Sequence, residues 1–334
     1  MDHLNQAVAR SRRTLQRSLL MWTNCFKIFL VLGLVAGGPA FSQNDPLPNE
    51  KIVFNSDING GHDIWMINPD GTGLEILIDR PGTQTFPRIS PDGTKVAYYH
   101  RPVPGGPRDI VIRDLATGTD TVLVTPFTNS PSTFEWFGDS AAIIARNIGG
   151  SCTGDPISFI PIDGSCAISL FAESGRRLTV MAVDPLTDVL YYSSDPCNSP
   201  NTEVKAYDIT TGHKTLIQSF DGRLEGRGET FLNTFVFQKA SSGYSNTRIA
   251  RMNTDGSGEL ILSTGSGLKD VNPRLSVDGT RAVFVRQEPS YDTDLYLVDL
   301  ETLLEIPLFL GPYSAGAPDW GVLRFGAAPA CSTP

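Results

Sequence analysis

Apolar and polar residues alternate along the chain in short runs, and each run ends in a turn-forming sequence. The segment Ile89-Ser-Pro-Asp-Gly-Thr-Lys-Val-Ala-Tyr98 shows the pattern most clearly: an apolar strand end, an Asp-Gly turn and an alternating strand. Leu275-Ser-Val-Asp-Gly-Thr-Arg-Ala-Val-Phe284 repeats it. Strict alternation beside an Asp-Gly turn is typical of a β-hairpin, so the chain is expected to be built from antiparallel strands.

A longer repeat contains these hairpins. A strand running into a second turn, as in Asp63-Ile-Trp-Met-Ile-Asn-Pro-Asp-Gly71, recurs through the chain, and a further apolar strand follows each time. These last strands end at intervals of 46, 47, 46, 46 and 46 residues, near Ile78, Val124, Phe171, Ile217, Ser263 and Phe309. A constant period with four short strands per unit is typical of a β-propeller. The sequence therefore predicts an all-β fold, a six-bladed β-propeller of four-stranded antiparallel blades over residues 51–321.

The first unit lacks an inner strand, because residues 51–56 correspond to the second strand of the other units. The C-terminal segment Ala317-Pro-Asp-Trp320 matches Phe86-Pro-Arg-Ile89 and Asn272-Pro-Arg-Leu275. We expect the C-terminal strand to join the first blade and to close the ring, which removes open sheet edges. A two-domain β-sandwich protein is the weaker alternative, since sandwiches need no in-phase units.

Residues 1–42 resemble a secretory signal peptide. Basic residues precede the apolar run 28–36, and the small residues Ala40 and Ser42 follow it, so cleavage is expected after Ser42. Two export routes stay open. One is Sec export, with Met1 or Met21 as the start, and the other is twin-arginine export through Ser11-Arg-Arg-Thr-Leu15. Residues 43–50 would form a short linker and residues 322–334 a C-terminal tail. These features predict a periplasmic or secreted protein with no transmembrane segment in the mature chain.

Charge excludes one class of partner. The 334 residues carry a net charge of −9, and removal of residues 1–42 leaves 22 basic and 35 acidic residues, a net −13. Nucleic acid is therefore excluded, because phosphate binding needs a basic face. Removal also leaves four cysteines. Cys152 and Cys197 occupy equivalent loops of neighbouring units, so either they form a disulfide or they are unpaired.

Signatures of catalysis are missing from the sequence. It has no Gly-x-Ser-x-Gly nucleophile turn, Walker loop or Rossmann fingerprint, and the histidines do not converge as zinc ligands would. The Asp-Gly turns lack the 12-residue ligand spacing of an EF-hand. We therefore predict no catalytic residue, no metal and no cofactor.

Two regions are candidates for binding. Residues preceding the aligned apolar positions of the inner strands should point into the channel, and they are Arg88, Glu135, Arg274 and Asp319. They could bind a charged peptide end or a carboxylate ligand, or pair with one another. The larger loops after each second strand, including 57–62 and 101–108, emerge on one face and suit protein recognition. The candidate contacts on that face are Tyr244, Tyr291, His62 and His100.

Residues 57–71 and 89–98 closely resemble the TolB-type propeller repeat, a WD-like family. In that family the propeller belongs to periplasmic TolB, which binds envelope lipoproteins, and related propellers stand before serine peptidases. This chain looks like a bare propeller without the N-terminal α/β domain of TolB. The resemblance implies a monomeric, exported, noncatalytic interaction module whose partner is an envelope protein or lipoprotein. The alternative is a propeller enzyme, a hydrolase or lyase with its substrate site at the channel mouth.

Overall fold

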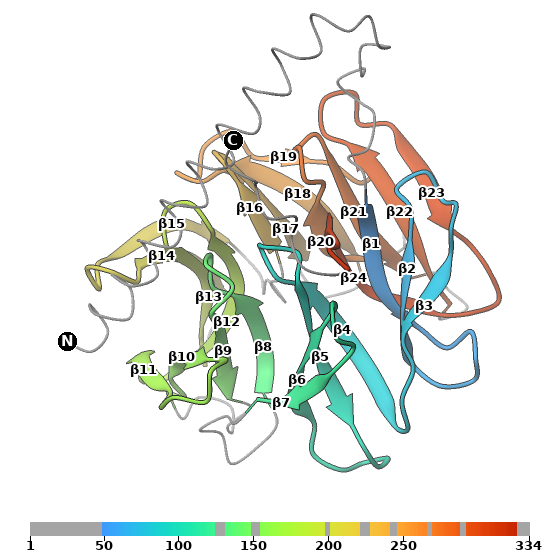
Figure 1. Ribbon diagram of the computed structural model, residues 1–334. Coiled ribbons are helices and arrows are strands. Elements are labelled where there is room, and N and C mark those ends of the chain that lie inside the picture. Colours follow the sequence, from blue (N-terminus) through green and yellow to red (C-terminus); the bar gives the residue numbers. More distant parts are fainter. Residues whose placement is uncertain are drawn as a thin grey trace, which may run out of the picture. The chain divides into compact units, whose positions relative to one another are not determined.

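The computed structural model describes residues 49–123, 131–147, 154–197, 201–220, 228–240, 246–265, 269–287 and 292–325. These residues form antiparallel strands joined by turns, and none of them is helical (Figure 1). Accordingly, this part of the chain holds no helix that could span a membrane. The all-β prediction is confirmed, while the proposed signal peptide at residues 1–42 lies outside the described residues.

Four sheets contain four strands each (Figure 1). The first has the order β24 (Ala315–Val322), β1 (Glu50–Ser56), β2 (Asp63–Ile67) and β3 (Glu75–Ile78). The second runs from β4 (Thr83–Ile89) through β5 (Lys95–Arg101) and β6 (Asp109–Asp114) to β7 (Asp120–Val122). The third contains β8 (Pro131–Trp136), β9 (Ala142–Asn147), β10 (Ile157–Pro161) and β11 (Ile168–Phe171). The fourth contains β12 (Arg176–Asp184), β13 (Val189–Pro196), β14 (Thr202–Asp208) and β15 (Lys214–Phe220).

The remaining strands form a single eight-stranded sheet. Its first half contains β16 (Gly228–Phe231), β17 (Thr234–Ala240), β18 (Thr247–Asn253) and β19 (Leu260–Ile261). Its second half contains β20 (Lys269–Leu275), β21 (Arg281–Gln287), β22 (Thr293–Asp299) and β23 (Glu305–Phe309).

The prediction of six separate four-stranded blades is therefore wrong. The described strands form four separate blades and one double-width sheet, in which β18 pairs in parallel with β20 at Thr247 and Lys269. The short strand β19 explains this joining. It pairs with β18 opposite Ala250 and Arg251, and the hydrogen bonds that follow it reach no further than Ile249, so the edge of β18 at Thr247 stays available to β20.

The C-terminal strand closes the first sheet as the sequence predicted. β24 pairs antiparallel with β1, and Trp320 lies opposite Ile52 while Asp319 lies opposite Val53. The first strand of every unit contacts the first strand of the next, so β24, β4, β8, β12, β16 and β20 form a closed circle. Residues on these strands therefore meet around one axis although they are far apart in sequence.

The apolar core lies in layers between neighbouring sheets. Val53 and Ile64 of the first sheet pack with Val96 and Tyr98 of the second, and similar clusters fill the other layers. This arrangement follows from the period of two along a strand, which sends alternate side chains to opposite faces of the sheet. Both faces of each blade are therefore apolar.

The repeated Ser-x-Asp-Gly sequence folds as a tight turn. Ser90 Oγ donates to Asp92 Oδ1 at 2.6 Å, the same Asp92 oxygen accepts the Thr94 N–H at 3.0 Å, and Gly93 takes a positive φ of 72°. The second copy, at residues 276–280, has the same hydrogen bonds. The aspartates of the repeat are thus occupied in forming turns.

Candidate functional site

The four predicted channel residues lie on the circle of first strands and are buried. Arg88 is on β4, Glu135 on β8, Arg274 on β20 and Asp319 on β24, and their exposed fractions are 3%, 9%, 2% and 6%. The structure brings all four together.

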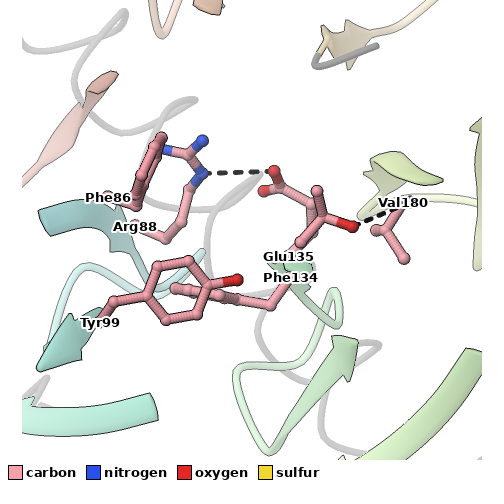
Figure 2. Close-up of a pocket in the computed structure, with 7 residues that line it drawn as sticks. Phe86, Arg88, Tyr99, Phe134, Glu135 and Val180 are labelled. Carbon is pink, nitrogen blue, oxygen red and sulfur yellow. Dashed lines mark hydrogen bonds and ion pairs between the residues drawn. The ribbon is translucent and has the colours of Figure 1, made fainter. Parts of the chain in front are cut away.

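Glu135 is the centre of this ion cluster. Its Oε1 accepts from Arg88 Nε at 3.2 Å, a contact that Figure 2 shows, and also from Nη2 of Arg274. Arg274 Nε lies 3.4 Å from Asp319 Oδ1. Because β8 and β20 stand on opposite sides of the circle of strands, the pair of Glu135 with Arg274 crosses the axis.

Backbone groups hold the two guanidinium groups in place. Arg88 Nη1 donates to the carbonyl oxygens of Pro87 at 2.6 Å and Pro318 at 3.3 Å, and Arg274 Nη1 donates to that of Gly228 at 3.0 Å. Since Pro318 lies on β24 and Gly228 on β16, each arginine joins its own strand to a neighbouring inner strand.

Glu229, on β16, is a fifth member of the cluster that the sequence comparison missed. Its Oε2 accepts the N–H of Leu275 on β20 at 2.6 Å, just as Asp319 Oδ2 accepts the N–H of Ile89 at 2.6 Å. The signal for Glu229 was weak because its unit has no Asp-Gly turn between the first two strands. The apolar alternation around residues 229–237 still places Glu229 where the other units carry their channel residues.

Burial sets the protonation of this cluster. It raises the pKa of Glu229 to about 8. The positive charge of Arg274 lowers this pKa, and the negative charges of Asp319 and Glu135 raise it further. Burial likewise raises the pKa of Asp319, opposed by Arg274 and Arg88. Burial lowers the pKa of Arg88, and the Arg274 charge lowers it further. The raised pKa favours the protonated form of Glu229, which lowers the negative charge beside the two guanidinium groups.

A small cavity lies beside the ion cluster. Figure 2 shows Phe86, Tyr99 and Phe134 around it, with Arg88 and Glu135 on one side. The rest of the lining is Thr133 and Val180, and the Thr133 Oγ1 accepts the Val180 N–H at 3.1 Å. Its volume of about 10 Å³ has room for about one water molecule. The cavity is therefore too small for a peptide or a sugar.

The predicted interaction residues are in different surroundings. His62 is exposed, whereas His100 is only 5% exposed and its Nε2 lies 2.9 Å from the Pro81 carbonyl oxygen. His100 thus contacts the connection between β3 and β4. Tyr244 and Tyr291 lie outside the described residues.

Cys197 is disulfide-bonded, and Cys166 is a free, exposed thiol. Cys152 lies outside the described residues, so its pairing with Cys197 stays a prediction. Across the residues whose positions are described, no group of three or more His, Cys, Asp or Glu side chains is arranged to hold a metal ion.

No family model matches the chain. An uncharacterized protein, Atu1656 of Agrobacterium fabrum, is 35% identical over 78 residues, which are 23% of this chain and 25% of that protein. The chain thus spans about a quarter of the length of this curated relative.

Solved structures resemble a much larger part of the chain. TolB from Acinetobacter baumannii matches 82% of this chain and 67% of its own, with a TM-score of 0.66 and 17% identity. The fold is that of the TolB propellers. A putative TolB from Agrobacterium tumefaciens matches 78% of this chain and 90% of its own, with a TM-score of 0.61 and 16% identity. The TolB-like resemblance stated from residues 57–71 and 89–98 is confirmed at the level of the fold.

Proposed function

We propose that this protein is an exported, noncatalytic β-propeller that binds an envelope protein or lipoprotein through the face carrying the loops after the second strands. The observation that supports this most is the ion cluster across the axis. Arg88 and Arg274 both pair with Glu135 and donate to inner-strand carbonyl oxygens, so these polar atoms serve the ring rather than a substrate. A rigid scaffold of this kind leaves recognition to its loops.

Export and the periplasmic or secreted location rest on the sequence of residues 1–42, which is typical of a signal peptide. The TolB-like fold supports the same compartment by analogy. A monomer is expected, since the ring of first strands closes within one chain.

An affinity capture tests the proposal. The purified protein is immobilised and challenged with detergent-solubilised envelope extract, in parallel with a Tyr244→Ala/Tyr291→Ala variant. His213→Ala is the matched control, because His213 is exposed in the turn between β14 and β15, on the opposite face. We expect one saturable partner that the double variant loses and the control keeps.

Two results would contradict the proposal. One is equal capture by the wild type, the double variant and the control, which would exclude recognition through this face. The other is robust hydrolase or lyase turnover that disappears in Arg88→Ala or Glu135→Ala, which would favour the enzyme instead.

A further inference from the structure

Asp63 is a buried carboxylate without a partner. It begins β2, lies directly opposite Ser56 of β1, and is 6% exposed. Among the described residues, its carboxylate accepts no hydrogen bond and forms no ion pair. Burial without a donor is costly for a carboxylate, because the water that would hydrate its charge is removed. Asp63 therefore differs from the carboxylates of the ion cluster, each of which accepts a hydrogen bond.

A second carboxylate lies beside Asp63. The ladder of β2 with β3 ends at Ile64 and Ile78, so Asp63 and Asp79 are the next residues on the two chain segments. Burial raises the pKa of Asp63, the negative charge of Asp79 raises it further, and the His62 charge lowers it. Asp79 is exposed, and within the described part of the chain its carboxylate also has no hydrogen bond or ion pair. The two carboxylates are thus close enough to repel each other.

Ser56 adds an unused hydroxyl at the same place. Its side chain is fully buried, and its Oγ has no hydrogen-bond partner among the described residues. Directly opposite residues of an antiparallel pair share a face of the sheet, so Ser56 points to the side that carries Asp63. A hydroxyl oxygen can accept hydrogen bonds as well as donate one. Two carboxylates and a buried hydroxyl therefore meet where the chain supplies no cationic donor.

The sixth unit shows which group the first unit lacks. Asp294 of β22 is aligned with Asp63 in the repeat, and it lies opposite Arg286 of β21. The Arg286 guanidinium group is held by Asp270 at 2.7 and 2.9 Å and by a glutamate of β23 at 2.8 Å. The first unit has Ser56 at the position of Arg286. The short side chain of Ser56 leaves the carboxylates of the first unit without a guanidinium group.

We propose that Asp63 and Asp79, beside the Ser56 hydroxyl, form a subsite that binds an arginine side chain of a protein partner. A guanidinium group is planar, has five N–H donors and forms charge-assisted hydrogen bonds with carboxylates. One bound arginine therefore relieves the repulsion between the two aspartates and supplies the donors that they lack. The net charge of −9 favours a basic partner segment. That the arginine belongs to an envelope protein or lipoprotein rests on the proposed function.

The subsite lies on the face assigned above to recognition. It directly follows the loop 57–62, in which Asp57 Oδ1 accepts the Ser314 N–H at 2.8 Å. The segment that ends at Ser314 carries Leu310 and Tyr313, which are 55% and 40% exposed. These side chains offer apolar contacts to the residues that flank the bound arginine.

Binding of a defined probe tests the subsite. The rhodamine-labelled pentapeptide Gly-Leu-Arg-Leu-Gly is titrated with the purified protein at low salt, and its anisotropy is followed. A second peptide carries citrulline, which has the shape of arginine without its charge. We expect saturable binding of the arginine peptide, and a loss of at least about tenfold in affinity for the citrulline peptide and for Asp63→Asn. The matched control is Glu75→Gln, which removes the same charge from the other end of β3 and should change affinity by less than about twofold.

Absence of binding by the wild type would overturn the proposal. Equal weakening in Asp63→Asn and Glu75→Gln would do so too, because the effect would then reduce to net charge. Stronger competition by calcium chloride than by guanidinium chloride at equal ionic strength would also overturn it, because the subsite would then prefer a metal ion to a guanidinium group.

Stability separates a binding role from a structural one. Without peptide, the urea midpoint of Asp63→Asn at pH 7 should equal or exceed that of the wild type, because the substitution removes a buried charge and its repulsion from Asp79. A clear drop in this midpoint would mean that Asp63 supports the fold, which overturns the proposal.

Partner capture distinguishes this inference from the proposed function. If Asp63→Asn loses the arginine peptide but keeps the envelope partner, recognition of that partner through the subsite is excluded. If the wild type captures no partner while binding of the arginine peptide depends on Asp63, the proposed function fails and the subsite stands.

Discussion

Replacement of Glu135 by glutamine should destabilise the protein strongly. The side chain of Glu135 is 12% exposed, and it neutralises Arg88 and Arg274, whose side chains are 3% and 2% exposed. Glutamine keeps the shape and one acceptor oxygen but removes the charge. Removing one partner of a buried ion pair costs about 3–5 kcal/mol, because the remaining charge stays buried and uncompensated. We expect a loss of this size in the free energy of unfolding.

The assay is urea unfolding at pH 7, followed by tryptophan fluorescence and circular dichroism. A double-mutant cycle with Arg274→Met isolates the contact across the axis, and the double variant should be more stable than the sum of the single losses predicts. A loss below about 1 kcal/mol for Glu135→Gln, the range of surface pairs, would refute the reasoning. A coupling energy near zero in the cycle would refute a stabilising contact between Glu135 and Arg274 across the axis.

Three further predictions concern protonation and backbone space. The raised pKa of Glu229, about 8, means that the folded state binds a proton more tightly than the unfolded chain, so the free energy of unfolding should fall as pH rises from about 4.5 to 8. Urea titrations at several pH values should show that Glu229→Gln flattens this slope. Burial opposes ionisation of Glu173, but hydrogen bonds from Ser194, Tyr192 and Lys205 lower its pKa to about 2. Glu173→Gln should therefore lower the free energy of unfolding by up to about 3 kcal/mol at pH 7, and by progressively less as pH falls from 4.5 to 2. An equal loss at pH 7 and at pH 2 would contradict this. Gly93 and Gly105 both have a φ of 72°, but a Cβ on Gly93 would overlap the Val322 carbonyl oxygen, whereas a Cβ on Gly105 would have open space. Thermal unfolding should therefore show a larger loss of stability for Gly93→Ala than the roughly 1 kcal/mol expected for Gly105→Ala.

The channel cluster has a consequence for function. Its carboxylates and guanidinium groups come from inner strands that are distant in sequence, and Arg88, Asp319 and Arg274 also bind backbone of a neighbouring strand. Such polar groups stabilise the closed ring and leave the loops free to change without loss of the fold. Recognition through loops such as 101–108 is consistent with this division.

The sequence by itself determined the local structure. Alternation in segments such as 89–98 specified hairpins, because side-chain direction along a strand depends only on neighbouring residues. The constant period specified repeated units, and the match of residues 317–320 to the other inner strands specified the closing pairing of β24 with β1. The same alternation placed Arg88 and Glu135 on the inner strands.

Only the tertiary structure decided which of these residues meet. Glu135 and Arg274 are 139 residues apart, and their contact depends on the diameter of the closed ring, which no local pattern encodes. The joining of β18 to β20 depends on how little of an edge the two-residue strand β19 covers. Glu229 became part of the cluster, and His100 became buried, through packing against neighbouring strands. Local patterns fix the direction of a side chain, whereas its partners depend on the positions of distant strands in the closed ring.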